Sequence, residues 1–459
     1  MKTITSLAAI ALLSSSLLAT ADVQTQIDEL TKEISKLKKA QKSTKKALTK
    51  VKKATGGDNV KFGLDFRNSV DVLDYKDNKN NLSANNPALL TSRLYLTMAA
   101  APMKGLIFKG KLAIYSTWGS HLYVDDAPLK DWSGSSKPTD TVMRVKEAYF
   151  VYSNAIGEQP ISVSIGRRPS TNGFLANYRE NEKSSGSPLA HITNMEVNGA
   201  MVKFSWDRFI PGAFTKLVLG RAHNGQMENV YGTGSTPWGP YADINSGKED
   251  ESVDFFVVPG MAYDNGQYAL MYQWAHIFNT KGIKLSDSTK KAASGTADLL
   301  ALSFKVDGIG DEINDFLDET TAFASVAISY YDAKNGYSLV GSKDGGISKG
   351  YSYWFGTIFP DMITDAGKFG LEYNHGSQNW TPMTWAEDSA MGSKIAVRGD
   401  AYEAYWNFNL FGNKYLPSQV RYTYAQHDYT PNINCAGWVK PVAVDITASD
   451  LRLSVSYRY

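Results

Sequence analysis

The chain ends in the stretch Leu451-Arg452-Leu453-Ser454-Val455-Ser456-Tyr457-Arg458-Tyr459, in which apolar and polar residues alternate strictly. Alternation with a period of two residues is typical of a β-strand that buries one face. The apolar face ends on Tyr459, and the other face carries Arg452 and Arg458. A last strand that pairs with the first strand leaves no open edge, which is what a barrel within a membrane requires. We therefore predict a closing strand at 446–459.

The first 21 residues predict a secretory signal peptide. Lys2 gives a positive start, Leu7 to Leu18 is mostly apolar, and Ala19-Thr20-Ala21 offers a small-residue cleavage site. Beyond Asp22 no apolar run reaches the ~18 residues that a spanning helix needs. We expect an exported chain that can enter a membrane only as a β-barrel.

Residues 22–56 predict a helix of a different character. Apolar or small residues recur there at alternating spacings of three and four, which favours a coiled coil; they are Ile27, Leu30, Ile34, Leu37, Gln41, Thr44, Leu48 and Val51. Positions 22–54 also hold ten lysines against four acids. We expect a periplasmic Lys-rich coiled-coil helix that self-associates and contacts anionic cell-wall polymer or lipid head groups. A solvated helix surface is the alternative interpretation.

Residues 57–459 predict an all-β domain, a transmembrane antiparallel β-barrel of about sixteen strands. The aromatic content of 12% with a mean hydropathy of −0.30 fits alternating lipid-facing and water-facing residues. Short and long connections alternate, and an even strand number places both barrel ends in the periplasm. The predicted strands are 59–72, 88–99, 105–119, 140–153, 159–168, 192–206, 214–224, 251–264, 266–279, 296–309, 319–333, 349–360, 367–376, 394–411, 417–430 and 446–459.

These features together resemble a Gram-negative outer-membrane porin. The stretch Ile165-Gly166-Arg167-Arg168-Pro169-Ser170-Thr171, followed by Tyr178-Arg179-Glu180-Asn181, is similar to a porin-like family defined by a domain of unknown function. The resemblance implies a location in the cell outer membrane, contact with its lipid and lipopolysaccharide, and a homo-oligomer, usually a trimer. General porins normally lack such a long N-terminal helix.

Strand parity predicts a basic wall inside the barrel. A charged residue that faces lipid near the midplane costs about 2–4 kcal/mol, so charged faces are assigned inward. The predicted inward cations of the first five strands are Arg67, Arg93, Lys109, Lys111, Arg144, Lys146 and Arg168. Glu147 conflicts with this parity because it falls on the outer face, and a β-bulge or a subunit contact would explain it.

The resemblance also implies that the loop from Pro169 to about His191 folds into the barrel and narrows it. Its candidate constriction residues are Arg179, Glu180, Glu182 and Lys183. Glu180 and Glu182 would face Arg67, Arg93, Lys111 and Arg168, and a transverse field of this kind favours dipolar solutes and biases ion choice. A surface loop with solvated charges is the alternative.

Other chemistry has little support in the sequence. The six histidines are far apart, and neither an H-x-x-x-H pair nor a G-x-S-x-G elbow occurs. The one cysteine, Cys435, can form neither an internal disulfide nor a metal cluster. Basic patches with interleaved aromatic residues are missing, so we expect no nucleic-acid partner. We predict no enzyme, no cofactor and no metal.

The sequence thus predicts a passive diffusion channel for small hydrophilic solutes or ions. A solute-specific channel is one alternative, and a barrel that encloses an electron-transfer or secretion partner is another. A third is an adhesin or anchor that links the outer membrane to the cell wall through residues 22–54. A barrel enzyme is the fourth.

Overall fold

The computed structural model describes residues 60–119, 142–182, 184–223, 252–310, 313–342, 344–364, 366–384, 388–431 and 439–459. The chain divides into two units, Met1–Asn59 and Val60–Tyr459. The predicted signal peptide, the predicted coiled-coil helix and Lys183 lie outside the described residues.

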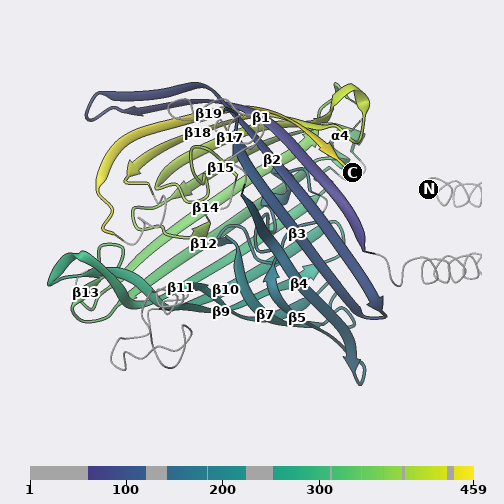
Figure 1. Cartoon of the computed structure of the whole chain (residues 1–459), viewed down its shortest axis with the longest axis horizontal. Coiled ribbons are helices and arrows are strands. Elements are labelled where there is room, and N and C mark those ends of the chain that lie inside the picture. The colour runs from purple at the N-terminus through teal and green to yellow at the C-terminus, as the bar shows by residue number, and fades with distance from the viewer. Residues whose placement is uncertain are drawn as a thin grey trace, which may run out of the picture. The chain divides into compact units, whose positions relative to one another are not determined.

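The second unit is a closed antiparallel β-barrel (Figure 1). Within the described residues its sheet has seventeen strands, one of which is the two-residue β13 (Tyr337–Ser338). Each of the others pairs with a neighbour on both sides. They are β1 (Lys61–Asp77), β2 (Leu82–Met103), β3 (Leu106–Thr117), β4 (Met143–Ile156), β5 (Gln159–Arg168), β7 (Val197–Ser205), β8 (Phe214–His223), β9 (Val253–Asp264), β10 (Tyr268–Lys284), β11 (Asp287–Asp307), β12 (Thr321–Ala333), β14 (Ile347–Pro360), β15 (Lys368–Gly376), β17 (Gly399–Asn409), β18 (Pro417–Tyr429) and β19 (Ala443–Arg458).

The barrel closes where the sequence predicts it. β19 pairs with β1, with Leu453 opposite Val70 and Arg458 opposite Asp65. The backbones of Leu64 and Tyr459 also exchange two hydrogen bonds of 2.9 and 2.8 Å. Each predicted strand overlaps one long strand of the structure, so the expected barrel of about sixteen strands is confirmed.

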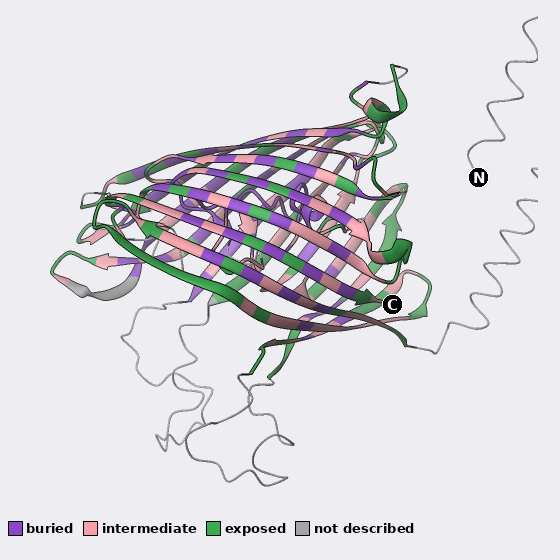
Figure 2. Cartoon of the chain, turned by 90° about the horizontal axis from the view of Figure 1, so that it is seen from above, coloured by how far each residue is buried: buried purple, intermediate pink, exposed green. Residues whose placement is uncertain are grey.

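The two faces of the wall differ as the alternation predicts. On β19, Leu451, Leu453 and Tyr457 are exposed on the outer face, whereas Arg452 is 4% exposed on the inner face. Figure 2 shows the same banding of exposed and buried residues along neighbouring strands. An apolar outer band with a polar interior is what a barrel in a lipid bilayer needs.

A β-bulge in β4 resolves the conflict at Glu147. Lys111 of β3 lies opposite Glu147, but the next residue, Leu112, lies opposite Val145, so Lys146 is the extra residue. A bulge shifts the strand by one residue and exchanges its faces. Glu147 therefore points inward, where its Oε1 lies 2.5 Å from Lys111 Nζ. Of the two explanations, the structure supports the bulge.

Two predicted strand segments are wrong. Residues 192–196 and 394–398 lie in long connections that run inside the barrel, before β7 and β17 begin. They are not part of the barrel sheet, although Thr193–Asn194 forms the two-residue strand β6. Ile395 and Val397 are fully buried there, so their alternation reflects burial by a loop and not membership of a strand.

The helices are short. They are α3 (Ala176–Arg179), α4 (Asp315–Asp318) and the 3-10 turn η2 (Leu410–Gly412). Within the described residues, no helix has the length and apolar character to cross a membrane.

One side of the barrel interior is an apolar core. The inner faces of β9 to β14 supply residues such as Phe255, Leu299 and Trp354, each at most 8% exposed. These pack against Leu189 and Trp380 of the long connections in one cluster of buried residues. The other side, from β1 to β5 and β19, is polar and charged, so any water-filled path lies along that side.

Candidate functional site

The first element of the site is inner loop 1 (residues 169–196), which connects β5 to β7. It contains α3 and the short strand β6 (Thr193–Asn194). The loop reaches strands on the far side of the barrel: Gln419 Nε2 of β18 donates to the Arg179 carbonyl at 2.6 Å. The backbone N–H of Leu189 donates to Gln273 Oε1 of β10 at 2.7 Å. Inner loop 1 therefore crosses the lumen, as the resemblance to porins implies for residues 169–191.

His191 fixes this loop to the wall. Its Nδ1 lies 2.7 Å from Ser325 Oγ of β12, and its Nε2 lies 2.9 Å from Ser352 Oγ of β14. The ring packs edge-on against Trp354 and Trp380. Burial without a charged partner lowers the pKa of His191 to about 3, so the ring is neutral at physiological pH.

Inner loop 2 (residues 377–398) connects β15 to β17, and only its inward fold could not be predicted from the sequence. Its short strand β16 (Met383–Thr384) pairs in parallel with β6, so the two inner loops run side by side. Arg398 ties the loop to itself, because its Nε donates to the Trp380 carbonyl at 2.9 Å and its Nη2 to Thr381 Oγ1 at 2.7 Å. Residues 385–387 lie outside the described part.

Lys394 anchors inner loop 2 through buried charges. Its Nζ lies 2.6 Å from Glu372 Oε2 of β15 and donates a second hydrogen bond to Glu403 of β17. Glu403 also lies 3.8 Å from Arg179 of inner loop 1. Since Lys394 is 3% exposed, these contacts are sheltered from water and salt.

Asp388 connects inner loop 2 to the opposite wall. Its Oδ2 lies 2.7 Å from Arg67 Nη2 of β1 and 2.7 Å from Arg93 Nη1 of β2. Its carbonyl accepts a 2.6 Å hydrogen bond from Arg452 Nη1 of β19. The backbone of Asp388 has a φ of 52°, a left-handed conformation that costs energy for a non-glycine residue and is typical of functional sites.

The charge of Asp388 is held by this arrangement. Burial opposes its ionisation, but the nearby guanidinium groups of Arg67, Arg93 and Arg452 outweigh burial. They hold the pKa of this carboxyl well below its usual range. Asp388 therefore remains an anion between the two arginines at any ordinary pH.

The basic wall is built around Tyr95 of β2. Arg93 stacks on its ring at 4.2 Å, and Lys111 Nζ lies 5.5 Å from the ring centroid. The Tyr95 hydroxyl forms a 2.8 Å hydrogen bond with the hydroxyl of Tyr115 on β3. Aromatic faces attract cations, so Tyr95 holds the basic side chains in a fixed array.

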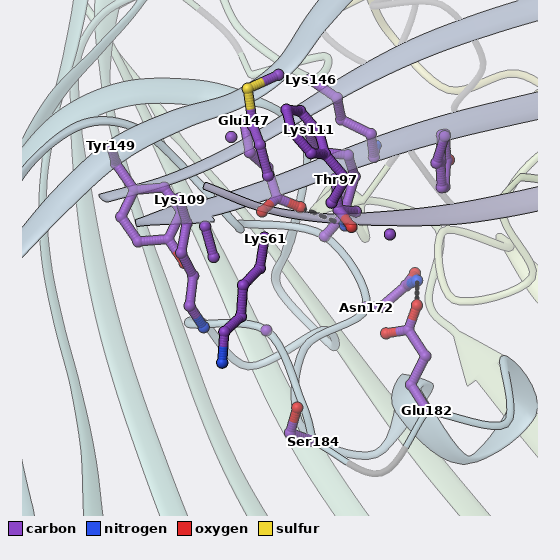
Figure 3. A pocket seen from close by; sticks show the side chains of 18 of the residues that line it. Lys61, Thr97, Lys109, Lys111, Lys146, Glu147, Tyr149, Asn172, Glu182 and Ser184 are labelled. Atoms are coloured by element: carbon purple, nitrogen blue, oxygen red, sulfur yellow. Dashed lines mark hydrogen bonds and ion pairs between the residues drawn. The ribbon is translucent and has the colours of Figure 1, made fainter. Parts of the chain in front are cut away.

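Two cavities meet at Arg93 and Asp388. One, of about 420 Å³, lies between the wall of β1 to β4 and residues 171–186 of inner loop 1. Its residues include Lys61, Lys109 and Lys111 on the wall, with Asn172 and Glu182 facing them from the loop (Figure 3). The other, of about 660 Å³, extends along the inner face of β1 to β3 past Asp71, Thr91 and Thr117.

The structure places all seven predicted wall cations on the inner side. Arg67 and Arg93 are buried, Lys109 and Arg144 are exposed, and Lys111, Lys146 and Arg168 are intermediate. Lys111 pairs with Glu147, and Lys146 donates a hydrogen bond to Glu196 at the end of inner loop 1. Arg144 lies opposite Ala113 near the end of β3 and lines neither cavity.

Glu180 lies between β18 and the basic wall. Its Oε1 lies 2.9 Å from Arg179 Nη2 and 3.7 Å from Arg421 Nη1 of β18, and its charge also interacts with those of Arg67 and Arg93. Glu182 does share the first cavity with Lys111, and it accepts a 3.2 Å hydrogen bond from Asn172. The carboxylate that contacts Arg67 and Arg93 is Asp388. Asp388 lies 295 residues after Arg93 in the sequence, so no local sequence pattern indicates that the two side chains meet.

In the parts of the chain that the structure describes, no group of three or more His, Cys, Asp or Glu side chains is arranged to hold a metal ion.

The closed barrel with two inward-folded loops has the fold of an outer-membrane porin. The anion-selective porin from Comamonas acidovorans has a similar structure, with a TM-score of 0.50 and 12% identity over 87% of this chain and 100% of that one. The high-pH structure of Pseudomonas putida OprB matches with a TM-score of 0.46 and 13% identity over 90% and 96%. The outer-membrane channel DcaP of Acinetobacter baumannii matches with a TM-score of 0.43 and 14% identity over 87% and 97%.

The chain belongs to the family described as protein of unknown function DUF3373, whose model matches residues 83–456. This confirms the resemblance to a porin-like family of that kind. No protein with a curated description matches the sequence.

Proposed function

We propose that the protein is a passive diffusion channel of the outer membrane for small hydrophilic solutes or ions. The observation that carries this proposal is the bridge from Asp388 on inner loop 2 to Arg67 and Arg93 on the wall, at which two cavities meet. A barrel of this strand number encloses more space than side chains alone fill. The inner loops occupy the apolar side and leave a charged path along β1 to β5.

The charged path forms the constriction. Arg67, Arg93 and Lys111 lie on one side, and Asp388 and Glu182 approach from the two inner loops. Opposed charges across a narrow aqueous path order water and favour dipolar solutes over apolar ones. Arg168 lies farther along the wall. Arg179 and Glu180 form ion pairs with each other and with charged residues of β17 and β18.

The apolar core favours a solute-specific channel as the second candidate. Fully buried residues such as Trp380, Leu189 and Ile395 fix both inner loops, so the path is narrow and its shape is set. A rigid, shaped path selects by fit as well as by charge. Outer-membrane lipid and lipopolysaccharide would surround the barrel, and a homo-oligomer is part of the same proposal.

A liposome swelling assay tests the proposal. Purified full-length protein in vesicles should let small sugars and amino acids enter, at rates that fall steeply with solute size. A general channel admits several solutes of equal size at similar rates, whereas a solute-specific channel admits one class much faster. Vesicles that do not swell with any small solute, although folded protein is present, would rule out a diffusion channel.

A further inference from the structure

Three cations gather on neighbouring strands at one side of the lumen, away from the Asp388 bridge. They are Arg168 of β5, Lys203 of β7 and Lys216 of β8. Lys203 and Lys216 lie directly opposite each other in the sheet, and Ser162 of β5 lies opposite Lys203 on its other side. Lys216 points inward, since Leu217 and Leu219 are exposed on the outer face of β8. Lys203 shares that face because it lies opposite Lys216, and Arg168 reaches inner loop 1.

Inner loop 1 draws these cations together. Arg168 Nη2 and Lys216 Nζ both donate to Ser187 Oγ, at 3.3 and 3.2 Å. Lys216 Nζ also donates to the Ser187 carbonyl at 3.3 Å. The Nζ atoms of Lys203 and Lys216 lie 4.2 and 4.9 Å from the ring centroid of Phe214. A single serine and a single aromatic ring thus hold three positive groups in one place.

In the described part of the chain, no carboxylate balances this cluster. Among the residues that the structure describes, none of the three forms an ion pair, although each is only partly exposed. Several other luminal cations have a carboxylate partner: Lys111 pairs with Glu147, Lys146 with Glu196 and Arg452 with Asp71. Like charges directly opposite each other in a sheet are destabilising, and partial burial adds a desolvation cost. An arrangement that costs stability without an internal partner points to an external one.

Unused hydrogen-bond donors lie at the same place. Arg168 Nη1 and Ser164 Oγ are buried and have no hydrogen-bond partner among the described residues. Ser164 lies on the inner face of β5, between Arg168 and the position opposite Lys203. Buried donors are almost always satisfied in native proteins, so two that are free beside three cations fit a ligand rich in acceptor oxygens.

We propose that Arg168, Lys203 and Lys216 form a binding site for a small oxyanion, such as phosphate, sulfate or a carboxylate. Several acceptor oxygens would receive charge-assisted hydrogen bonds from the guanidinium and the two ammonium groups. The proposal rests on the proposed function in one respect, because an open lumen gives the anion access. The site would raise the local concentration of oxyanions on the charged path.

Calorimetric titration of the purified full-length protein in detergent tests the site without any measurement of transport. Inorganic phosphate is the first probe, and sulfate and acetate are the second and third. The Lys203→Gln/Lys216→Gln variant should bind phosphate at least about tenfold more weakly, since one hydrogen bond to a charged group is already worth that factor. The matched control is Lys76→Gln/Lys104→Gln, which removes two exposed lysines and should bind as the wild type does.

The thermal unfolding temperature is a second measurement, and it shows whether a variant that fails to bind phosphate is still folded. Phosphate should raise the unfolding temperature of the wild type and the control but not that of the variant. Without phosphate the variant should be at least as stable as the wild type, because the repulsion between the lysines is gone. Absence of phosphate and sulfate binding in the wild type, or equal binding in the variant, would overturn the site. Phosphate binding by a protein that fails to swell liposomes would instead keep the site and refute the channel.

Discussion

Neutralising Asp388 should shift the ion selectivity of the channel toward anions. The Asp388→Asn variant keeps the size of the side chain but leaves Arg67 and Arg93, each 2.7 Å from the lost charge, without their shared carboxylate. If the path has the dielectric constant of water, the electrostatic energy of an ion that passes about 5 Å from the Asp388 carboxylate changes by about 0.8 kcal/mol when that charge is lost. The energies of anions and cations change in opposite directions, so the ratio of anion to cation permeability should rise by roughly tenfold.

Reversal potentials in planar bilayers measure this change. Wild type, Asp388→Asn and the control Asp318→Asn are compared under the same potassium chloride gradient. Asp318 is exposed on α4, so its substitution changes the net charge equally but should leave the potential as in the wild type. An Asp388→Asn channel with the wild-type reversal potential would refute the placement of Asp388 on the conducting path.

Three further outcomes are expected. Burial and the neighbouring Glu180 raise the pKa of Glu182, so it takes up a proton at a higher pH than an ordinary glutamate and makes the lumen more positive; wild-type anion preference should grow as the pH falls from about 7 to about 4, and a Glu182→Gln channel with the same pH dependence would contradict this. Below about pH 6.5 the unfolded chain binds a proton at His191 that the folded barrel, in which the pKa of His191 is about 3, does not bind. His191 should therefore lower the free energy of unfolding by about 1.4 kcal/mol for each pH unit that the pH falls below about 6.5. Urea unfolding in lipid vesicles should show a shallower dependence on pH for His191→Gln than for the wild type, and an equal dependence would exclude this effect. The Lys394→Met variant leaves two buried carboxylates without their lysine and should lose about 3–5 kcal/mol of unfolding free energy; a loss below about 1 kcal/mol, the level of an exposed ion pair, would show that this cluster is well hydrated.

The barrel could be predicted from the sequence because its signal is local. In a strand with lipid on one face and water on the other, apolar and polar residues must alternate. The sequence of Leu451–Tyr459 therefore predicts both that it is a strand and which of its faces points inward. The same parity predicted the inward side of Arg67 and Arg93. It failed at Glu147, where one extra residue exchanges the faces, and the bulge leaves no clear mark in the composition.

The inner loops could be predicted only in part. The resemblance to porins indicated inner loop 1, but nothing local indicated that a second loop would bring Asp388 to Arg67 and Arg93. The segment 394–398 alternates because Ile395 and Val397 are buried by loop packing, and a periodic pattern does not say what covers a residue. The apolar inner faces of β9 to β14 carried a usable signal, since strands that are apolar on both faces are covered on both.

Single-channel recording in planar bilayers tests the central claim most directly. Purified full-length protein should insert and give discrete, reproducible ion-conducting steps in wild type. If folded protein inserts, as verified by its recovery from the bilayer-forming lipid, but gives no conducting step, the claim that a water-filled charged path runs through this barrel is contradicted.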